Sequence, residues 1–275
     1  MSTSPSWAAD RGEAIERPEA ARALVLVPGI ELRPMAGAHN GARGLFTGLL
    51  TLAPGASMPY YARPAAEAMV LLEGDAAVDV EERRYRLEPL DAVAVEPRRP
   101  RRVANLSADR PAAFHVALAS AAPEQNWVNG RFTPAEQPPA TNGRVGSERV
   151  VRRTLAPVTE LAPRARFQDL YNAELGTHGI CGGYGLFEPG ARLPCHRHQF
   201  DESITIVGGT ATCIVEGRRH ELAGLATALV PEGLCHYFIN LTLEPMAMIW
   251  VYAGDMPDRI VMGEHFCHPE AARGS

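Results

Sequence analysis

Apolar positions along the chain occur in short runs that are bounded by glycine and proline. Clear examples are residues 203–207 (SITIV), 211–217 (ATCIVEG) and 226–231 (ATALVP), which are rich in β-branched residues. Runs of this length and content between turn residues are typical of strands. A further run at residues 23–29 (ALVLVPG) indicates a first strand. The pattern therefore predicts a β-rich chain.

The strand pattern is repeated along the chain. The segment GLLTLAPGA begins at Gly48, and GYGLFEPGA begins at Gly183, which sets an offset of 135 residues. The same offset aligns Pro54 with Pro189, Gly55 with Gly190, Pro59 with Pro194, Glu67 with Glu202, Gly74 with Gly209, Leu87 with Leu222 and Asn105 with Asn240. A repeat of this length predicts two copies of one structural unit.

Three histidines and one glutamate of the second copy form a candidate metal site. His196 and His198 lie two residues apart, and residues i and i+2 of a strand point to the same face. Glu202 follows after a short bend, and His236 comes from a later strand. Three imidazoles and one carboxylate are typical ligands of a divalent transition metal ion. The alternative is a group of histidines buried in a hydrogen-bonded core.

The spacing of these residues resembles the two sequence motifs of the cupin superfamily. The first motif is matched by Gly190, His196, His198, Glu202 and Gly209, and the second by Gly224, Pro231, Gly233, His236 and Asn240. The resemblance implies an all-β fold of two tandem cupin (jelly-roll) barrels, called a bicupin. It also implies a metal ion bound by His196, His198, Glu202 and His236. The expected parts are an N-terminal arm (1–22), barrel 1 (23–120), a linker (121–165), barrel 2 (166–262) and a tail (263–275).

The first copy differs at the ligand positions. It has Tyr61, Arg63 and Arg101 where the second has histidines, and Glu67 alone is retained. Arginine stays protonated and has no lone pair for a metal. We therefore expect no metal in barrel 1 and an ion pair of Glu67 with Arg63 or with Arg101 or Arg102. The barrel could be purely structural, or its arginines could bind a carboxylate or phosphate.

The segments outside the repeat are harder to interpret. The arm is expected to be mobile or to lie on another subunit. Residues 149–158 could be the first strand of barrel 2 or a strand exchanged between the barrels, and residues 166–176 could be a short helix or a loop. In the tail, His265, Cys267 and His268 could form a second metal site, although simple packing beside the barrel is the default.

Composition narrows the function classes. The chain has no lysine, which excludes Schiff-base catalysis and lysine-bound pyridoxal phosphate. The net charge of −5 gives no reason to expect nucleic acid or an anionic membrane as partner. The basic run at residues 98–102 is not interpreted as a nucleic-acid patch, because glutamates that can neutralise it lie nearby in the sequence.

The five cysteines suggest no disulfide scaffold, and Cys195 and Cys235 are expected to be packed thiols. No apolar run could span a bilayer, so we expect a cytoplasmic protein, with a homodimer as the expected assembly.

The sequence also predicts the surroundings of the metal. Residues 245–254 (PMAMIWVYAG) alternate, so one set of side chains faces inward and predicts an apolar, aromatic cavity. The candidate catalytic residues are Tyr252, Asn240 and Trp250. The candidate substrate-binding residues are Arg192, Phe200, Tyr237, Phe238 and Arg259.

Such a site suits Fe, Mn, Ni, Co or Zn, with Fe or Mn favoured, and leaves positions open for a small organic substrate. The resemblance favours a dioxygenase acting on an oxygen-chelating substrate. A redox-neutral decarboxylase, isomerase, lyase or aminohydrolase is the first alternative. A small-ligand-binding protein without catalysis is the second.

Overall fold

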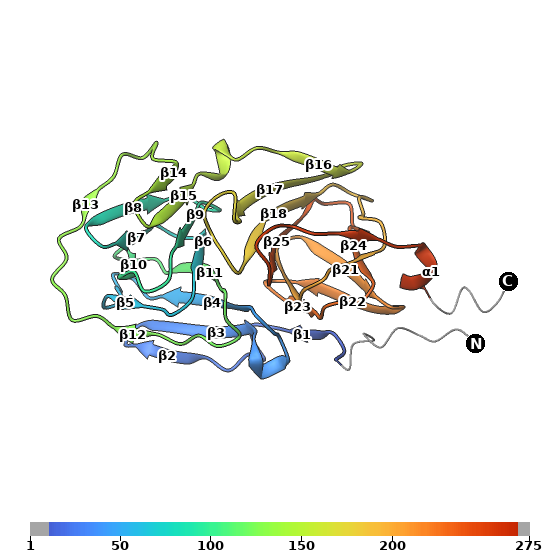
Figure 1. Ribbon diagram of the computed structural model, residues 1–275, viewed down its shortest axis with the longest axis horizontal. Helices are drawn as coiled ribbons and strands as arrows, with labels where there is room; N and C mark the ends of the chain where they lie inside the picture. The colour runs from blue at the N-terminus through green and yellow to red at the C-terminus, as the bar shows by residue number, and fades with distance from the viewer. Residues whose placement is uncertain (1–10, 269–275) are drawn as a thin grey trace.

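The computed structural model describes residues 11–268 and shows two β-barrels side by side (Figure 1). The first half of the chain, coloured blue to green, builds barrel 1, and the second half, yellow to red, builds barrel 2. Each barrel consists of a larger and a smaller sheet, and nearly all strand pairs are antiparallel. The prediction of an all-β fold with two tandem jelly-roll barrels is confirmed.

Barrel 1 is built from an eight-stranded and a six-stranded sheet. The larger sheet has the order β14 (Gly143–Val145), β15 (Glu148–Val151), β9 (Ala92–Val95), β6 (Glu67–Glu73), β11 (Ala112–Leu118), β4 (Phe46–Leu52), β3 (Ile30–Ala36) and β2 (Leu24–Val27). The smaller sheet has the order β12 (Asn126–Trp127), β5 (Tyr61–Ala62), β10 (Arg101–Asn105), β7 (Ala76–Val80), β8 (Arg83–Leu87) and β13 (Ala135–Glu136).

Barrel 2 is built from a seven-stranded and a five-stranded sheet. The larger sheet has the order β1 (Ala14–Glu16), β23 (Thr227–Val230), β20 (Glu202–Gly208), β25 (Met246–Tyr252), β18 (Cys181–Phe187), β17 (Ala165–Tyr171) and β16 (Thr159–Ala162). The smaller sheet has the order β22 (Arg218–Ala223), β21 (Thr210–Val215), β24 (His236–Ile239), β19 (His196–Arg197) and β26 (Ile260–Val261). The helical segments of residues 11–268 are short: η1 (Ala38–Asn40), η2 (Arg153–Leu155) and α1 (Glu264–Cys267).

Strand alternation divides most of the buried apolar side chains among three large clusters, and a small fourth cluster lies around Cys195 and Tyr237. One cluster fills each barrel, and a third lies between the barrels. In β25, Trp250 and Tyr252 belong to the interior of barrel 2, whereas Ile249 and Val251 belong to the layer between the barrels. The inward set predicted by the alternation is thus the one that contains the tryptophan and the tyrosine.

Turns at equivalent places of the two barrels use the same residues. Gly55 and Gly190 each follow a proline, and their φ angles of 68° and 77° lie in the left-handed region, where glycine carries no steric cost. Near each turn, the side chain of Asn105 or Asn240 donates to backbone carbonyls and accepts from a backbone N–H two residues on. The repeated sequence is therefore a repeated way of closing the barrel.

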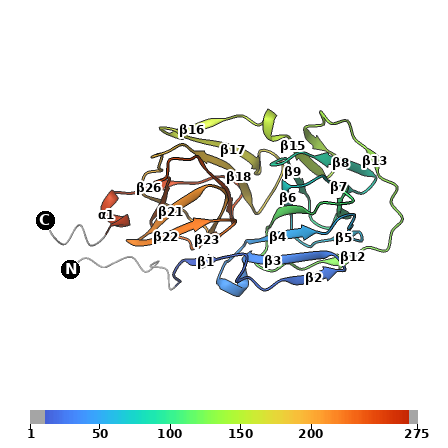
Figure 2. The same cartoon turned by 180° about the vertical axis from the view of Figure 1, so that it is seen from behind.

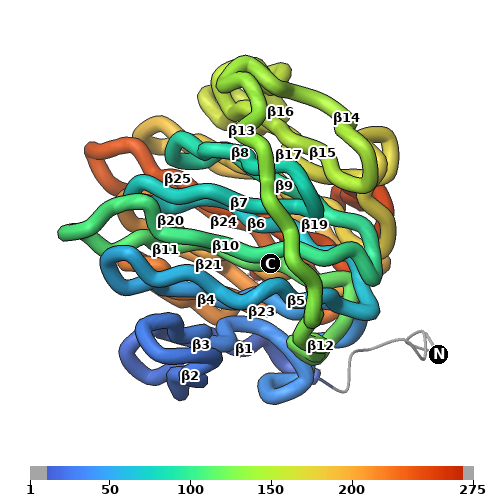
Figure 3. The backbone as a smooth tube through the Cα atoms, turned by 90° about the vertical axis from the view of Figure 1, so that its left-hand side faces the viewer, coloured from blue at the N-terminus to red at the C-terminus, as the bar shows by residue number. Residues whose placement is uncertain are grey.

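The arm and the linker connect the barrels. Ala14 pairs with Leu229, so β1 adds a strand to barrel 2 of its own chain, and Figure 2 shows it there from behind. Residues 1–10 of the predicted arm lie outside the described residues. Figure 3 shows the segment between β12 and β13 crossing the end of barrel 1. Beyond it, β14 and β15 join barrel 1, because β15 pairs with β9, and β16 is the first strand of the barrel 2 part.

The expectation of a helix or loop at residues 166–176 is wrong for its first half. Residues up to Tyr171 form β17, which pairs with β18 and places Phe167 in the interior of barrel 2. The segment is a strand because both faces of the sheet are buried here. Phe167 points into barrel 2, and Leu170 packs in the layer between the barrels. In residues 11–268 no helix has the length and apolar character needed to cross a membrane.

Candidate metal centre

Three neighbouring elements of barrel 2 bring the predicted ligands together. His196 of β19 is paired directly with His236 of β24, and Glu202 is the first residue of β20. The potential ligand atoms of His196, His198, Glu202 and His236 all lie within 4.8 Å of one another. All four residues are at most 4% exposed. The four residues therefore form one buried cluster inside the barrel.

Backbone carbonyls fix the orientation of each imidazole. The Nδ1 atom of His196 lies 2.8 Å from the carbonyl oxygen of Pro194, and that of His236 lies 3.0 Å from that of Leu234. The Nδ1 of His198 bonds to the carbonyl of Asp258. A carbonyl can only accept, so each Nδ1 carries a proton, and Nε2 is the ring nitrogen that can offer a lone pair once it is unprotonated. This is the tautomer that a metal ligand requires.

Charges within the cluster keep the carboxylate ionised. Burial alone would raise the pKa of Glu202, but the adjacent His198 and His236 hold it well below its usual value. Burial, followed by repulsion from the other two histidines, lowers the pKa of His196 well below its usual value. The cluster thus favours an anionic carboxylate beside a neutral His196, which is the protonation that binds a cation.

The cluster fits a divalent transition metal ion. The Nε2 atom of His198 is buried and has no hydrogen-bond partner, although it lies 3.2 Å from the Oε2 atom of Glu202. Such an unsatisfied buried nitrogen is costly unless another group takes its lone pair. Two ligand atoms on opposite sides of an ion are at most ~4.4 Å apart. The four side chains, whose potential ligand atoms lie within 4.8 Å of one another, would therefore need to move little to bind an ion. The donor set of three imidazoles and one carboxylate matches Fe, Mn, Co, Ni or Zn.

Aromatic rings cover the cluster on the side of His198. The ring of Phe200 is stacked on that of His198 with 5.8 Å between centroids, and the ring of Tyr252 lies 4.5 Å from it. Trp250 packs against Tyr252 at 5.0 Å. Phe238 belongs to the same barrel interior. Of the predicted pocket residues, Phe200, Phe238, Trp250 and Tyr252 therefore lie inside barrel 2.

A cavity of about 440 Å³ lies behind this aromatic layer. Trp250 and Tyr252 line it, so Tyr252 separates the cavity from His198. Arg259 also lines the cavity, hydrogen-bonds to Tyr252 and lies over the ring of Phe167 at 5.8 Å. The predicted Arg259 is thus placed where a small acid could reach it.

Two predicted substrate-binding residues point elsewhere. Tyr237 packs outside the barrel with Cys195 and Cys267, and its hydroxyl lies 3.0 Å from Nε2 of His268. Arg192 lies over the ring of Tyr237 and forms an ion pair with Glu264. The contacts of Arg192 and Tyr237 thus lie outside the barrel and not at the cavity: Tyr237 follows a ligand directly in β24, and adjacent strand residues face opposite ways.

The side-chain amide of Asn240, a predicted catalytic residue, is occupied by backbone groups of a turn. Its amide nitrogen donates to the carbonyl oxygens of Phe187 and Glu244, and its amide oxygen accepts from the backbone of Thr242. These bonds use the side chain to close a turn. The equivalent Asn105 does the same in barrel 1, where no histidine cluster exists. The motif asparagine is therefore explained by the fold.

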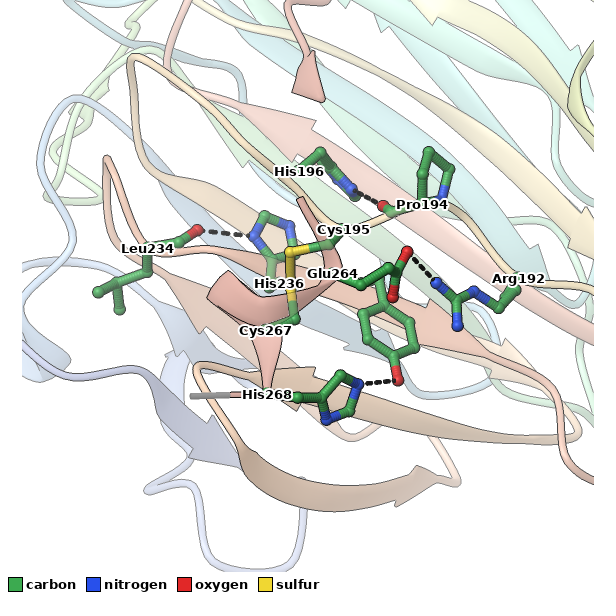
Figure 4. The surroundings of a disulfide bond; sticks show 10 residues. Arg192, Pro194, Cys195, His196, Leu234, His236, Glu264, Cys267 and His268 are labelled. Atoms are coloured by element: carbon green, nitrogen blue, oxygen red, sulfur yellow. Dashed lines mark hydrogen bonds and ion pairs between the residues drawn. A yellow bond between two sulfur atoms is a disulfide. The ribbon is translucent and has the colours of Figure 1, made fainter. Parts of the chain in front are cut away.

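The tail forms a strap beside the metal cluster. Residues 258–268 run along β19, where Val261 pairs with His196, and a disulfide joins Cys195 to Cys267 (Figure 4). Figure 2 shows β26 and α1 at this end of barrel 2. The prediction of a packed thiol at Cys195 is wrong, whereas Cys235 is free and buried. Cys267 is used by the disulfide, and residues 11–268 contain no second cluster of potential metal ligands, so the tail does not form a second site there.

In barrel 1 arginines fill the place of the metal cluster. The two oxygens of Glu67 accept from Nε of Arg63 and Nε of Arg101, each at 2.7 Å, and Oε2 also accepts from the hydroxyl of Tyr61 at 3.1 Å. The predicted ion pair is present. Arg102 pairs with Asp79 instead. Both arginines of the triad are at most 4% exposed, so they offer no accessible anion site.

Comparison with known proteins agrees with this geometry. The family described as "Cupin domain" matches residues 48–118 and 183–252, which together are just over half of the chain. This chain belongs to the cupin family. The two matches correspond to the two barrels, so this cupin is a bicupin. No curated protein matches it in sequence.

Solved structures share its fold. The oxalate decarboxylase of Lactobacillus farciminis, in a formate complex, has a TM-score of 0.73 at 15% identity over 90% of this chain and 88% of that one. A mutant of the Bacillus subtilis oxalate decarboxylase has a TM-score of 0.71 at 15% identity, covering 90% of this chain and 79% of that one. AerE from Microcystis aeruginosa has a TM-score of 0.63 at 13% identity, covering 84% and 96%. These likenesses show the fold of this cupin.

Sequence reasoning missed three contributors to the site. Asp258 acts through its backbone carbonyl, which carries no signal in the sequence. The carboxylate of Asp201, the residue before Glu202, accepts hydrogen bonds from both terminal (Nη) nitrogens of Arg11 and from the backbone N–H of Arg43. These bonds tie the arm and barrel 1 to the cluster. Asp169 lines the cavity from β17, a segment that was not expected to be a strand.

Proposed function

We propose that this bicupin is a metal-dependent enzyme that carries out a redox-neutral reaction, such as a decarboxylation or another lyase reaction, on a small carboxylic acid. The observation that supports this most is the convergence of three Nε2 atoms and one carboxylate next to a cavity that holds an arginine. An ion bound there would act as a Lewis acid that polarises substrate oxygens. The fold neighbours that are oxalate decarboxylases support this class, and one of them has Mn(II) centres, so we favour Mn over Fe.

The side chains of the chain supply the remaining functions. Arg259 would bind a substrate carboxylate, because its Nε is buried without a hydrogen-bond partner. Tyr252 lies between the cavity and His198. A substrate that passes from the cavity to the ion would therefore either contact the ring of Tyr252 or displace it. Trp250 and Phe200 exclude water from the cluster. A redox-neutral reaction needs positioned proton donors, and the acidic side chains that line the cavity are those of Tyr252, Asp169, Glu174 and Asp258.

A dioxygenase remains the second candidate function. The aromatic, apolar surroundings of the cluster, formed by Phe200, Trp250 and Tyr252, favour it because they would hold an unsaturated substrate. Oxygen dependence separates the two candidates. Protein loaded with Mn(II) or Fe(II) would be assayed on small carboxylic acids, beginning with oxalate, with and without air. Equal turnover without air supports the redox-neutral proposal, and turnover that consumes one O2 per substrate overturns it.

The compartment and assembly are also proposals. We propose that the Cys195–Cys267 disulfide forms in the working protein, which opposes the predicted reducing cytoplasm, because disulfides are rare there. Thiol counting on protein extracted from its native cells under alkylating conditions decides this: three free thiols support the proposal, and five support the cytoplasm. A homodimer, expected for a bicupin, would be tested by sedimentation.

A further inference from the structure

The cavity beside the metal cluster is lined by side chains of opposite charge. Arg259 contributes a guanidinium, and Asp169, Glu174 and Asp258 contribute carboxylates. Within residues 11–268, neither Arg259 nor Asp169 forms an ion pair; the partner of the Asp169 carboxylate is the amide of Asn172 at 3.0 Å. Opposite charges in one partly enclosed space would pair if they could reach each other. Each is therefore left available to a ligand.

The carboxylate of Asp169 faces the inside of barrel 2. Asp169 lies two residues after Phe167 in β17, and Phe167 belongs to the barrel interior. Asp169 also lines the cavity together with Trp250 and Tyr252, whose side chains belong to the same interior. Burial, followed by the nearby Glu174, raises the pKa of Asp169. No cation compensates its charge, so a cationic ligand group would stabilise it.

A second donor of the cavity also lacks a partner. Trp250 is 4% exposed, and its indole N–H has no hydrogen-bond acceptor. The indole lies directly over Gly183, where a Cβ atom would be 2.6 Å from the ring, so the backbone holds it in place. A buried donor of this kind is satisfied by a ligand oxygen at little cost. Trp250 and Arg259 therefore both offer donors to a ligand in the cavity, and Asp169 offers an acceptor.

We propose that the cavity selects a small zwitterion, with a carboxylate held at Arg259 and Trp250 and a protonated amine held at Asp169. This inference rests on the proposed function and specifies its substrate class. Asn172 positions the carboxylate of Asp169, and Glu174 adds negative potential at the same wall. The arrangement disfavours a dianion, because its second carboxylate would lie against Asp169. A dicarboxylate such as oxalate is then a poor substrate.

Binding of matched probes to the Mn(II)-loaded full chain tests this inference. Calorimetry would compare butanoate with 2-aminobutanoate, 4-aminobutanoate and succinate. We expect at least one amino acid to bind ten or more times more tightly than butanoate, and succinate to bind no better than butanoate. Asp169→Asn should reduce the preference for the amine to less than about twofold while leaving butanoate binding unchanged. Arg259→Gln should weaken all four probes.

The control variant Asp75→Asn changes an exposed carboxylate of barrel 1 and should leave all affinities unchanged. Mn(II) stoichiometry, measured on every variant, shows whether the fold and the cluster are intact. Equal binding of butanoate and both amino acids, no binding of any probe, or a preference that survives Asp169→Asn would each overturn the inference. The proposed function is tested separately, since it fails only if the cluster binds no ion or turnover consumes one O2 per substrate.

Discussion

Glu67 and Glu202 begin equivalent strands, β6 and β20, and each carboxylate lies between two nitrogen-bearing side chains. Glu202 lies 2.8 Å from Nε2 of His236 and 3.2 Å from Nε2 of His198, whereas Glu67 bonds to two guanidinium groups. The imidazoles can give a lone pair to a metal, and the guanidiniums cannot. One position of the fold thus supports a cation site in one barrel and an internal ion triad in the other.

Removing the carboxylate of barrel 1 should destabilise the protein. Glu67→Gln leaves Arg63 and Arg101 buried without an anion, and breaking a buried ion pair in this way costs about 3–5 kcal/mol. Urea unfolding measures the loss. The control Glu73→Gln alters an exposed residue at the other end of β6 and should change stability by less than about 0.5 kcal/mol. A loss below about 1 kcal/mol for Glu67→Gln would show that the triad does not stabilise the barrel.

A buried histidine between the barrels should make stability fall in acid. His115 is fully buried on the face of β11 opposite Phe114, and neither ring nitrogen has a hydrogen-bond partner. Burial lowers its pKa to about 4, from 6.5. The unfolded chain therefore takes up this proton first as pH falls from 6.5. The free energy of unfolding therefore falls by about 3 kcal/mol by the time the pH has fallen through 4, because one pKa unit corresponds to about 1.4 kcal/mol.

The variant His115→Leu tests this assignment. Unfolding free energies of the wild type and the variant would be compared between pH 7 and pH 4. The wild type should lose about 3 kcal/mol more than the variant over this range, since other titrating groups act equally in both. Parallel pH dependences of the two proteins would contradict the role of His115.

Breaking the disulfide should loosen the strap beside the cluster. The Cys195–Cys267 bond closes a loop of 72 residues, and bonds of this kind contribute about 2–4 kcal/mol. The strap also supplies the Asp258 carbonyl that orients His198. Cys267→Ser should therefore lower both the melting temperature and, by about tenfold, the metal affinity. Reductant should have the same effect on the wild type and none on the variant. A wild type whose melting temperature is unchanged after full reduction would refute this.

The sequence predicted the ligand cluster because the spacing of its residues is set by strand geometry. His196 and His198 share a face, and the offset of the repeat identified the substituted positions around Glu67. The same alternation, applied to Tyr237, would have placed it outside beside its ligand neighbour. It was instead grouped with the pocket aromatics, and the structure places it under the tail.

Other features depend on contacts between distant segments. The disulfide requires the tail to return to β19, and no local pattern near Cys195 or Cys267 records this path. The carbonyl of Asp258 and the cavity position of Asp169 likewise follow from how β17 and the strap pack on barrel 2. Asn240 is a different case, because a residue predicted to be catalytic from its place in a motif uses its side chain to close a turn.

Titration of metal-free protein with Mn(II) tests the central claim most directly, that barrel 2 alone binds a metal ion through its four side chains. Free Mn(II) would be measured by electron paramagnetic resonance for the wild type, Glu202→Gln and Glu67→Gln. We predict one tightly bound ion per chain in the wild type, one in Glu67→Gln, and at least a hundredfold weaker binding in Glu202→Gln. No bound ion in the wild type, or unchanged binding in Glu202→Gln, would contradict the account.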